Sequence, residues 1–344
     1  MNIPNHIPDE ATLDELLSRP TTDLTNFMKE LDGDIMILGA AGKIGVTLSC
    51  MAARAIKEAG VIKKVIAVDL YWDDPALDSM KNAGVETIRC DLLSRSEVSD
   101  LPVVKNIIYM AGRKFGTGDN QELTWAINVI VPGNVAHHFK ESRIVVFSSG
   151  CVYPLVPVDR GCTEDVPPWP IGEYSISTLG RERVFSYYSL TYGTNICQYR
   201  LNYAIDLRYG VLYDIGIKVF KAQPVELAVS HFNCIWQGDA NRLALMCLDQ
   251  CNSPPNVLNI TGPETISVRE TAEKFARLFN KKVAFIGEKK NSTMYLSNAS
   301  RSFEIFGKPI VPLDRMIEWQ AGWIDQGGRS LNKPTHFEVT SGQY

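Results

Sequence analysis

The chain has 344 residues, of which 45% are hydrophobic, 22% charged and 9% aromatic. This composition excludes disordered, collagen-like and coiled-coil chains, and the length allows two domains. The net charge of −4 comes with no basic block, which argues against a nucleic-acid surface, and no apolar run reaches the ~20 residues that cross a bilayer. The N-terminal segment lacks the basic and apolar regions of a signal peptide, so we expect a cytoplasmic protein that binds no membrane.

Residues 1–31 differ in pattern from the rest of the chain. They carry two short helical patterns with Pro20 between them, and Asp23 stands where it could cap the second helix. We predict an N-terminal helical extension that packs on the main domain.

From Asp34 onward, short apolar runs alternate with amphipathic helical patterns. The predicted strands are residues 35–38, 65–68, 85–90, 107–110 and 144–147, and the predicted helices are residues 48–59, 125–140 and 175–192. Strands that are apolar throughout and separated by helices indicate a parallel sheet covered on both faces. We therefore predict an α/β fold with a doubly wound parallel sheet.

The alternation becomes less regular after Arg200. One more strand–helix unit is predicted at residues 232–236 and 239–248. We assign residues 32–201 and 230–250 to the sheet domain, residues 202–229 and 251–330 to a smaller, discontinuous C-terminal substrate domain, and residues 331–344 to a tail.

The first strand is followed by a glycine-rich loop, GAAGKIG, from Gly39 to Gly45. Its glycines permit a tight turn through which the N–H groups of the next helix can face a pyrophosphate, as in Rossmann-type folds. Asp69 ends the next strand, where its carboxylate can bind the adenosine ribose and repel a 2′-phosphate. This favours NAD over NADP, although the Lys43 cation beside the same ribose weakens the preference. The alternative is a glycine turn that serves only strand–helix packing.

Several segments resemble the extended short-chain dehydrogenases/reductases, the NAD-dependent epimerase/dehydratase family. They are the GxxGxxG loop, CDL at residues 90–92, YMAGRK at 109–114, WAINVIVPGNVA around Asn128, FSSGCVYP at 147–154 and RLNY at 200–203. The resemblance extends to VLNITGPETISVRETAEKFARLF and YLSNASRSFEIFG near the C-terminus. It implies NAD as the cofactor and a Rossmann-type fold. The cofactor-binding residues that it implies are Gly39, Ala41, Gly42, Lys43, Ile44, Gly45, Asp69, Asp91, Leu92, Ala111, Gly112, Lys114, Asn128 and Tyr174.

The resemblance also implies a catalytic pair, Ser149 and Tyr174. Ser149 would hold the substrate oxygen, and Tyr174 would exchange its proton as hydride passes to or from nicotinamide. The family's YxxxK lysine, which lowers the tyrosine pKa from ~10 and binds the ribose, is replaced here by Thr178. Thr178 can still hydrogen-bond the ribose but supplies no charge. Arg181 and Lys114 are both candidates for the missing cation, and the sequence does not choose between them.

Three interpretations of this substitution compete. The protein is an active oxidoreductase or epimerase with a substituted proton relay, or an NAD-binding sensor or scaffold that has lost the chemistry, or a protein in which Ser149 and Tyr174 are ordinary buried hydroxyls. Because both hydroxyls persist together with the glycine loop, we favour the first interpretation.

The residues beside Ser149 narrow the reaction. Family dehydratases carry an Asp-Glu pair there, whereas this chain has Gly150 and Cys151. Cys151 matches an acid/base cysteine of the GDP-fucose synthase branch, although an inert core thiol is the commoner role. Nucleotide-sugar members often place a diphosphate-binding arginine where counting back from Asp239 reaches Phe232. We expect a carbohydrate-like substrate, either a nucleotide sugar or a free sugar, sugar acid or other small polyol.

The remaining polar residues suggest no metal site. His137 and His138 are adjacent on a predicted helix, and no HxxxH or CxxC spacing occurs, so we expect no metal and reduced cysteines. The helix at residues 175–192 is rich in apolar and aromatic residues, namely Val184, Phe185, Tyr188 and Leu190. Family members commonly dimerise through this helix and the one at 125–140, so we expect a homodimer. Burial within the monomer is the alternative.

Overall fold

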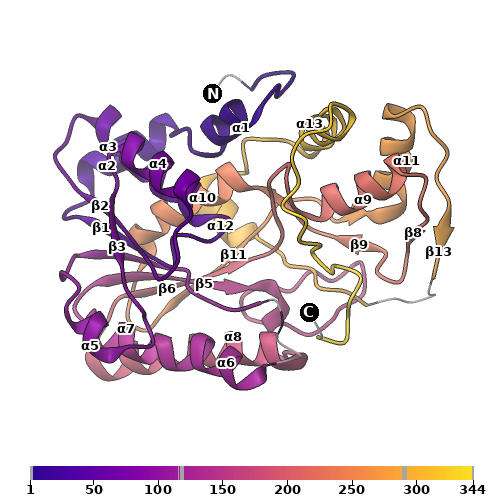
Figure 1. The fold of residues 1–344 in the computed structure, drawn as a ribbon. Coiled ribbons are helices and arrows are strands. Elements are labelled where there is room, and N and C mark those ends of the chain that lie inside the picture. Colours follow the sequence, from indigo (N-terminus) through magenta and orange to yellow (C-terminus); the bar gives the residue numbers. More distant parts are fainter. Residues whose placement is uncertain (1–2, 115, 117–119, 289–292, 343–344) are drawn as a thin grey trace.

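The computed structural model describes residues 3–114, 116, 120–288 and 293–342. Its centre is a seven-stranded, all-parallel sheet with the strand order β11-β6-β5-β4-β1-β2-β3 (Figure 1). The strands are β1 (Ile35–Leu38), β2 (Val65–Asp69), β3 (Glu86–Arg89), β4 (Asn106–Tyr109), β5 (Arg143–Ser149), β6 (Ile196–Leu201) and β11 (Asn256–Ile260). The predicted Rossmann-type fold is confirmed. Strand β11 comes from the segment that the sequence interpretation assigns to the second domain, and it forms an edge of this sheet.

Helices cover both faces of the sheet. One face carries α2 (Thr22–Glu30), α3 (Gly45–Ala59), α4 (Asp74–Ala83) and α10 (Gln237–Met246), and the other carries α5 (Arg95–Ser99), α6 (Gln121–Trp125), α7 (Val131–His138) and α8 (Gly172–Tyr192). Successive strand residues point to opposite faces, so Ile35 and Ile37 join the first core while Met36 and Leu38 join the second. This two-sided burial explains why the strands are apolar throughout.

The helix predicted at residues 125–140 is interrupted. A π-helical turn, Ala126–Ile130, separates α6 from α7. Pro132 has no N–H for the carbonyl of Asn128 four residues earlier, so the regular hydrogen-bond ladder cannot pass this point. The turn directs Asn128 inward, where it is fully buried.

The N-terminal extension forms two helices, as predicted, α1 (Glu10–Leu17) and α2. The expected cap is wrong, because Thr21 and not Asp23 caps α2. Asp23 instead pairs with Arg242 of α10 at 2.5 Å. Helix α1 packs against α3 and α10, so the extension lies on the main body of the fold.

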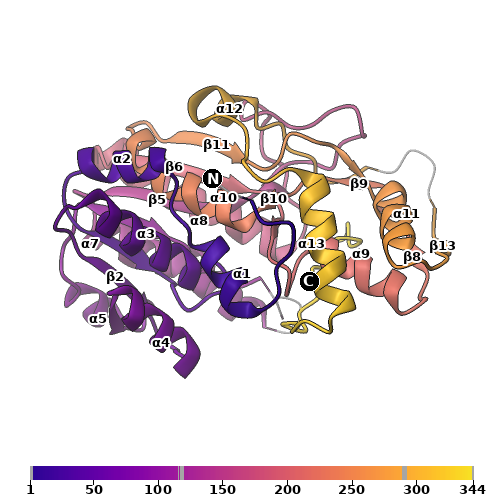
Figure 2. The same cartoon turned by 90° about the horizontal axis from the view of Figure 1, so that it is seen from above.

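The second part of the molecule is built around α9 (Val211–Phe220), α11 (Val268–Leu278) and α13 (Leu313–Asp325) (Figures 1 and 2). Its short strands are β7 (Ala204–Ile205), β8 (Val225–Glu226), β9 (His231–Phe232), β10 (Ile235–Trp236), β12 (Ile266–Ser267) and β13 (Phe285–Ile286), and α12 (Ser300–Phe306) packs on β11. The single strand predicted at 232–236 is two strands in different sheets. The chain turns at Asn233, whose side chain bonds the backbone of Glu264 and Ser297.

Residues 331–342 return from α13 and lie between the two parts of the molecule (Figures 1 and 2). Phe337 is only 4% exposed and belongs to the core of the second part. The segment that the sequence describes as a tail is therefore anchored by the buried Thr335 and Phe337, while residues 332–334 are exposed.

Candidate active site

The glycine loop joins β1 to α3 at the carboxyl edge of the sheet. Gly39 has φ +86°, and a Cβ there would lie 2.5 Å from the backbone N of Ala111, while a Cβ at Gly45 would collide with the backbone of Ala40. Packing alone therefore requires these two glycines. A Cβ at Gly42 would meet only the Gly39 oxygen, at 3.6 Å, so packing does not require Gly42. Its bare backbone faces solvent and leaves room for a ligand to approach the loop.

Two aspartates lie at the ends of neighbouring strands, Asp69 as the last residue of β2 and Asp91 just after β3. Asp69 accepts hydrogen bonds from Ala41 N at 2.9 Å and from Leu70 N at 2.8 Å, which ties the glycine loop to β2. Asp91 accepts one from Leu93 N at 2.9 Å. Asp69 therefore contacts the glycine loop directly, whereas Asp91 bonds within the turn that follows β3.

Ser149, Cys151 and Tyr174 line one pocket. Ser149 ends β5, and its Oγ lies 2.9 Å from the Cys151 Sγ. Tyr174 stands in the first turn of α8. Burial, and then the neighbouring Cys151, raise the pKa of Tyr174 to about 12, while the Arg181 charge and the hydroxyls of Ser149 and Thr178 act in the opposite direction.

Thr178 and Asn128 lie behind this pocket. Both are fully buried, and neither is in the pocket wall as the described residues form it. The Asn128 side chain bonds the backbone of Arg113, the Ser177 hydroxyl and the Arg181 guanidinium. Asn128 therefore does not face the pocket itself, and it supports the pocket wall through its hydrogen bond to Arg181.

Arg181 reaches the pocket wall two turns after Tyr174. Its Nη1 donates to Phe147 O and its Nη2 to Asn128 Oδ1, both at 2.8 Å. The side chain is 5% exposed, forms no ion pair with any described residue, and leaves Nε without a hydrogen-bond partner there. The guanidinium lies against Gly112, where a Cβ would collide with it. A buried cation is thereby held beside Tyr174 by neutral acceptors.

Two lysines face the same pocket. Lys43 Nζ lies 3.1 Å from the centre of the Tyr209 ring, and burial together with nearby Lys114 and Lys333 lowers the pKa of Lys43 to about 7. Lys114 Nζ donates to Thr335 O at 3.4 Å, and burial lowers its pKa also.

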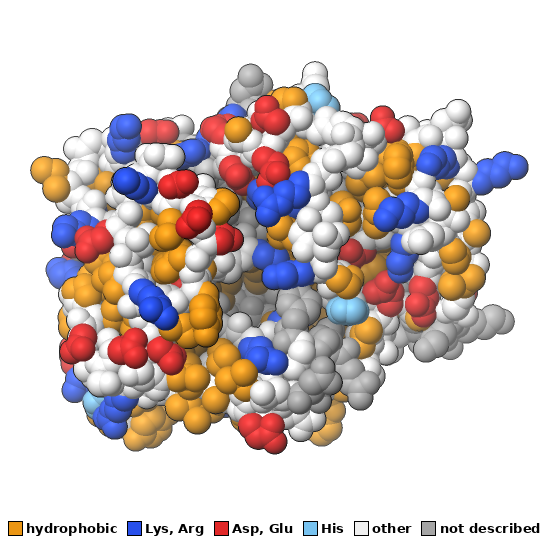
Figure 3. Space-filling view, in the orientation of Figure 1, with side chains coloured by type: hydrophobic (Ala, Val, Ile, Leu, Met, Phe, Trp, Pro, Cys, Tyr) orange, Lys and Arg blue, Asp and Glu red, His pale blue; other side chains and the backbone are white. Residues whose placement is uncertain are grey.

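The pocket is a cavity of about 240 Å³ between the two parts of the molecule. Figure 3 shows a hollow on this face with Lys and Arg side chains at its edge. No described aspartate or glutamate is in the wall. The sequence reasoning did not identify the residues of the second wall, which are Asn202, Tyr203, Tyr209, Gln237, Tyr295 and Thr335. Asn202, Tyr203 and Tyr295 lie in the RLNY and YLSNASRSFEIFG segments, for which the sequence predicted no site role, and the other three lie outside every segment that resembles the family.

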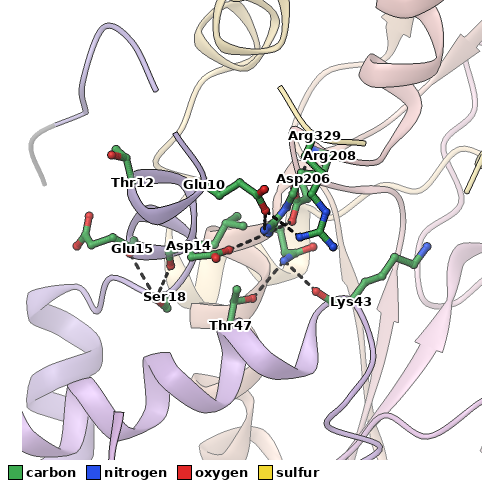
Figure 4. Close-up of polar contacts among 12 residues, drawn as sticks. Glu10, Thr12, Asp14, Glu15, Ser18, Lys43, Thr47, Asp206, Arg208 and Arg329 are labelled. Atoms are coloured by element: carbon green, nitrogen blue, oxygen red, sulfur yellow. Dashed lines mark hydrogen bonds and ion pairs between the residues drawn. The ribbon is translucent and has the colours of Figure 1, made fainter. Parts of the chain in front are cut away.

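The N-terminal extension supports this second wall. Figure 4 shows Glu10 and Asp14 of α1 directed toward Arg208, with Asp206 beside it. The Arg208 Nη2 lies 2.9 Å from Asp14 and 2.7 Å from Asp206. Because Tyr209 is the next residue, α1 fixes the segment that covers Lys43.

Within the described residues, no cluster of three or more His, Cys, Asp or Glu side chains could hold a metal ion. The eight cysteines are free thiols. A search of the described helices for one long and apolar enough to span a membrane finds none.

Residues 35–204 match the model of the NAD dependent epimerase/dehydratase family. This segment of the chain belongs to that family. NAD is therefore its cofactor, and the open backbone at Gly42, in the loop that Ala41 joins to Asp69, fits that dinucleotide. No curated protein sequence matches the chain.

Solved structures of epimerases and dehydratases share the fold. The UDP-glucuronic acid 4-epimerase of Bacillus cereus, in complex with UDP-glucuronic acid and NAD, is 18% identical with a TM-score of 0.68, over 85% of this chain and 99% of that one. The UDP-glucose 4-epimerase of Thermotoga maritima, with UDP-glucose, is 16% identical with a TM-score of 0.68, over 86% and 99%. The dTDP-glucose 4,6-dehydratase of Bacillus anthracis, with NAD, is 16% identical with a TM-score of 0.69, over 85% and 96%.

Proposed function

We propose that this family member is an active NAD-dependent oxidoreductase or epimerase that acts on a secondary hydroxyl of a carbohydrate-like substrate, with Arg181 in the role of the absent YxxxK lysine. The observation that carries the proposal is the buried Arg181 guanidinium, which lines the same pocket as Ser149 and Tyr174 and has no described carboxylate partner. A buried cation held only by neutral acceptors costs free energy of folding, so its presence here favours a functional role for the charge.

Ser149 and Tyr174 would divide the work at the reacting oxygen. The Ser149 hydroxyl holds the oxygen that alternates between alcohol and carbonyl, and the Tyr174 hydroxyl takes up its proton or returns it. Bound NAD supplies the hydride acceptor. The Arg181 charge favours the tyrosinate form, while burial and Cys151 oppose it. Burial and Cys151 outweigh the Arg181 charge and leave the pKa of Tyr174 at about 12, so this tyrosine is protonated at neutral pH in the resting enzyme.

Cys151 has a narrower role in this proposal. Its Sγ lies 2.9 Å from Ser149 Oγ, so it can orient the serine hydroxyl. The segment also lacks the Asp-Glu pair of family dehydratases, which supports oxidation or epimerisation over water loss.

A homodimer forms part of the proposal. Phe185, expected at its surface, is instead in the monomer core, but Ile130, Tyr187, Leu190 and Tyr192 on the π turn and α8 are more than half exposed. Such adjoining apolar side chains favour pairing of two copies through this face. Light scattering at micromolar concentration tests it, and a monomeric mass would refute the dimer.

The function is tested on the purified full chain. Retained NAD(H) is measured first. Sugars, sugar acids and nucleotide sugars are then screened by reduced-nicotinamide absorbance, with NMR of the products to detect epimerisation that recycles the cofactor. We expect turnover of at least one secondary alcohol. If no substrate is turned over but NAD binding alters the interaction with a partner, the protein is a sensor or scaffold and the proposed enzymatic function is wrong.

A further inference from the structure

The C-terminal segment, residues 331–342, contributes Thr335 to the wall of the pocket. Thr335 donates from N at 2.8 Å and from Oγ1 at 2.6 Å to Asp214 Oδ2, at the start of α9. Leu331 N donates to Arg208 O at 3.0 Å, and Glu338 pairs with Lys218 at 2.7 Å. These contacts fix the segment to the second part of the molecule.

The same segment also contacts the sheet-centred part. Lys114, which follows β4, donates to Thr335 O, and the backbone of Gly342 lies against Gly172 at the start of α8. A Cβ at either glycine would collide with the opposing chain. The segment therefore bridges both sides of the pocket, with Thr335 in its wall.

Phe337 fills the space beyond this wall. Its ring centre lies 6.2 Å from that of Phe232, the residue reached where nucleotide-sugar relatives often have an arginine for the diphosphate. Phe337 and Phe232 help to enclose a residual void of only about 10 Å³. Two packed aromatic rings offer no charge and no space to a diphosphate.

The size and charge of the remaining cavity define what can enter. Its volume of about 240 Å³ is below the ~300–1,000 Å³ typical of pockets for drug-sized ligands, and the nicotinamide end of the cofactor must share it. Lys43, Lys114 and Arg181 line the cavity, while no described carboxylate does. Arg181 and the protonated forms of the two lysines, whose pKa values burial lowers, give this wall a positive charge that attracts anions.

We infer that residues 331–342 close the outer end of the pocket, so that the substrate is a free sugar acid of monosaccharide size and not a nucleotide sugar. This inference rests on the proposed function for the reaction, but its size and charge arguments concern binding alone.

Binding to the full chain, saturated with NAD, tests the inference by calorimetry. Glucuronate and galacturonate are compared with their UDP-linked forms for size, and with glucose and galactose for charge. We expect at least one free acid to bind at least tenfold more tightly than both its UDP-linked form and its neutral counterpart. Equal or tighter binding of the UDP-linked form, equal binding of the neutral sugar, or no binding of either acid would overturn the inference.

Variants of the segment sharpen the test. Phe337→Ala should lower the dissociation constant of the UDP-linked acid at least tenfold and change that of the free acid less than threefold, while Ser341→Ala, at an exposed position, should change neither. If Phe337→Ala does not fold, hydrogen exchange of residues 331–342 in the parent protein replaces it. The exchange rates of residues 331–342 should not change when UDP-glucuronate is added. A large increase in these rates, together with saturable binding of UDP-glucuronate, would contradict the closed wall.

Two lysine variants test whether positive charge in the wall binds the acid. Lys114→Gln should weaken the free acid at least tenfold and leave the neutral sugar unchanged, whereas Lys64→Gln, at an exposed lysine, should affect neither. An unchanged acid affinity would refute the charge argument. Binding of a free acid without turnover would refute the proposed function and leave this inference intact, whereas turnover of a nucleotide sugar alone would do the reverse.

Discussion

The two walls of the pocket are built in different ways. The wall toward the sheet comes from strand ends and from helices that follow them within a few residues, such as Gly39 to Gly45 after β1 and Ser149 at the end of β5. The opposite wall collects Tyr209, Tyr295 and Thr335 from distant segments, held by α1 and by residues 331–342. Local geometry thus constrains the cofactor and the proton chemistry, whereas long-range packing shapes what the substrate can be. Substitutions that affect one wall and not the other test this division.

The largest effect is expected from the reacting hydroxyl. Tyr174→Phe removes the group that exchanges the proton and should lower kcat by ~10²–10⁴-fold, the usual range for a general acid or base. NAD affinity should change less than threefold, because the loop and the two aspartates are unaltered. Steady-state kinetics and calorimetry measure the two quantities. Tyr192→Phe, at an exposed tyrosine, is the matched control, and parental turnover in Tyr174→Phe would refute the assignment.

Two glycines of the loop should differ in what they affect, Gly45 the stability of the fold and Gly42 the binding of NAD. Gly45→Ala should destabilise the protein by ~1–3 kcal/mol or more, because its Cβ collides with the Ala40 backbone. Gly42→Ala should leave the melting temperature nearly unchanged and weaken NAD at least tenfold, since its Cβ would occupy space that only a ligand needs. Thermal unfolding and NAD titration distinguish them. If Gly42→Ala binds NAD like the parent, the cofactor does not approach this backbone.

Arg181 should affect rate through the pKa of Tyr174. Arg181→Met removes a charge that lowers that pKa, so oxidation below the pKa should slow by ~10-fold for each unit by which the pKa rises. In the parent, the oxidation rate should rise with pH toward about 12, because the proton acceptor is the deprotonated tyrosine. Carbonyl reduction uses the protonated form and should not rise. A pH–rate profile of each variant is the measurement, and Arg181→Lys should shift the profile less than Arg181→Met.

The smallest effect on activity is expected from Arg208, which connects the second wall of the pocket to α1. Arg208→Gln removes the ion pairs that join α1 to the segment beside Tyr209. The Michaelis constant for substrate should rise a few-fold, with NAD affinity unchanged, because Tyr209 loses its support while the glycine loop keeps its own. Arg329→Gln, which loses only an exposed pair with Glu10, is the control. Equal effects of both variants would show that α1 does not position this wall.

The sequence predicted the sheet and the cofactor loop because their signals are local. The strands at 35–38 and 65–68, the glycine loop and Asp69 each lie within one short segment, and the structure has them as predicted. The π turn was missed, since Pro132 signals a break but not its form. The split between β9 and β10 depends on what Asn233 bonds elsewhere in the chain, which no local pattern reveals.

The same limit applies to the pocket. Lys114 and Arg181 were both candidates for the missing cation, but only the fold shows that Arg181 is held by Asn128 and Phe147 O. Thr335 lies more than a hundred residues from Asp214, and their contact has no signature in either segment. Residues of this kind become visible only when distant parts of the chain are brought together.

The packed C-terminal segment also sets the order in which the protein is completed during synthesis. The sheet and its glycine loop can form while later residues are still being translated, yet the outer wall needs Thr335 and Phe337, which are translated long after that loop. A nascent chain therefore has its cofactor loop before its substrate chamber is closed.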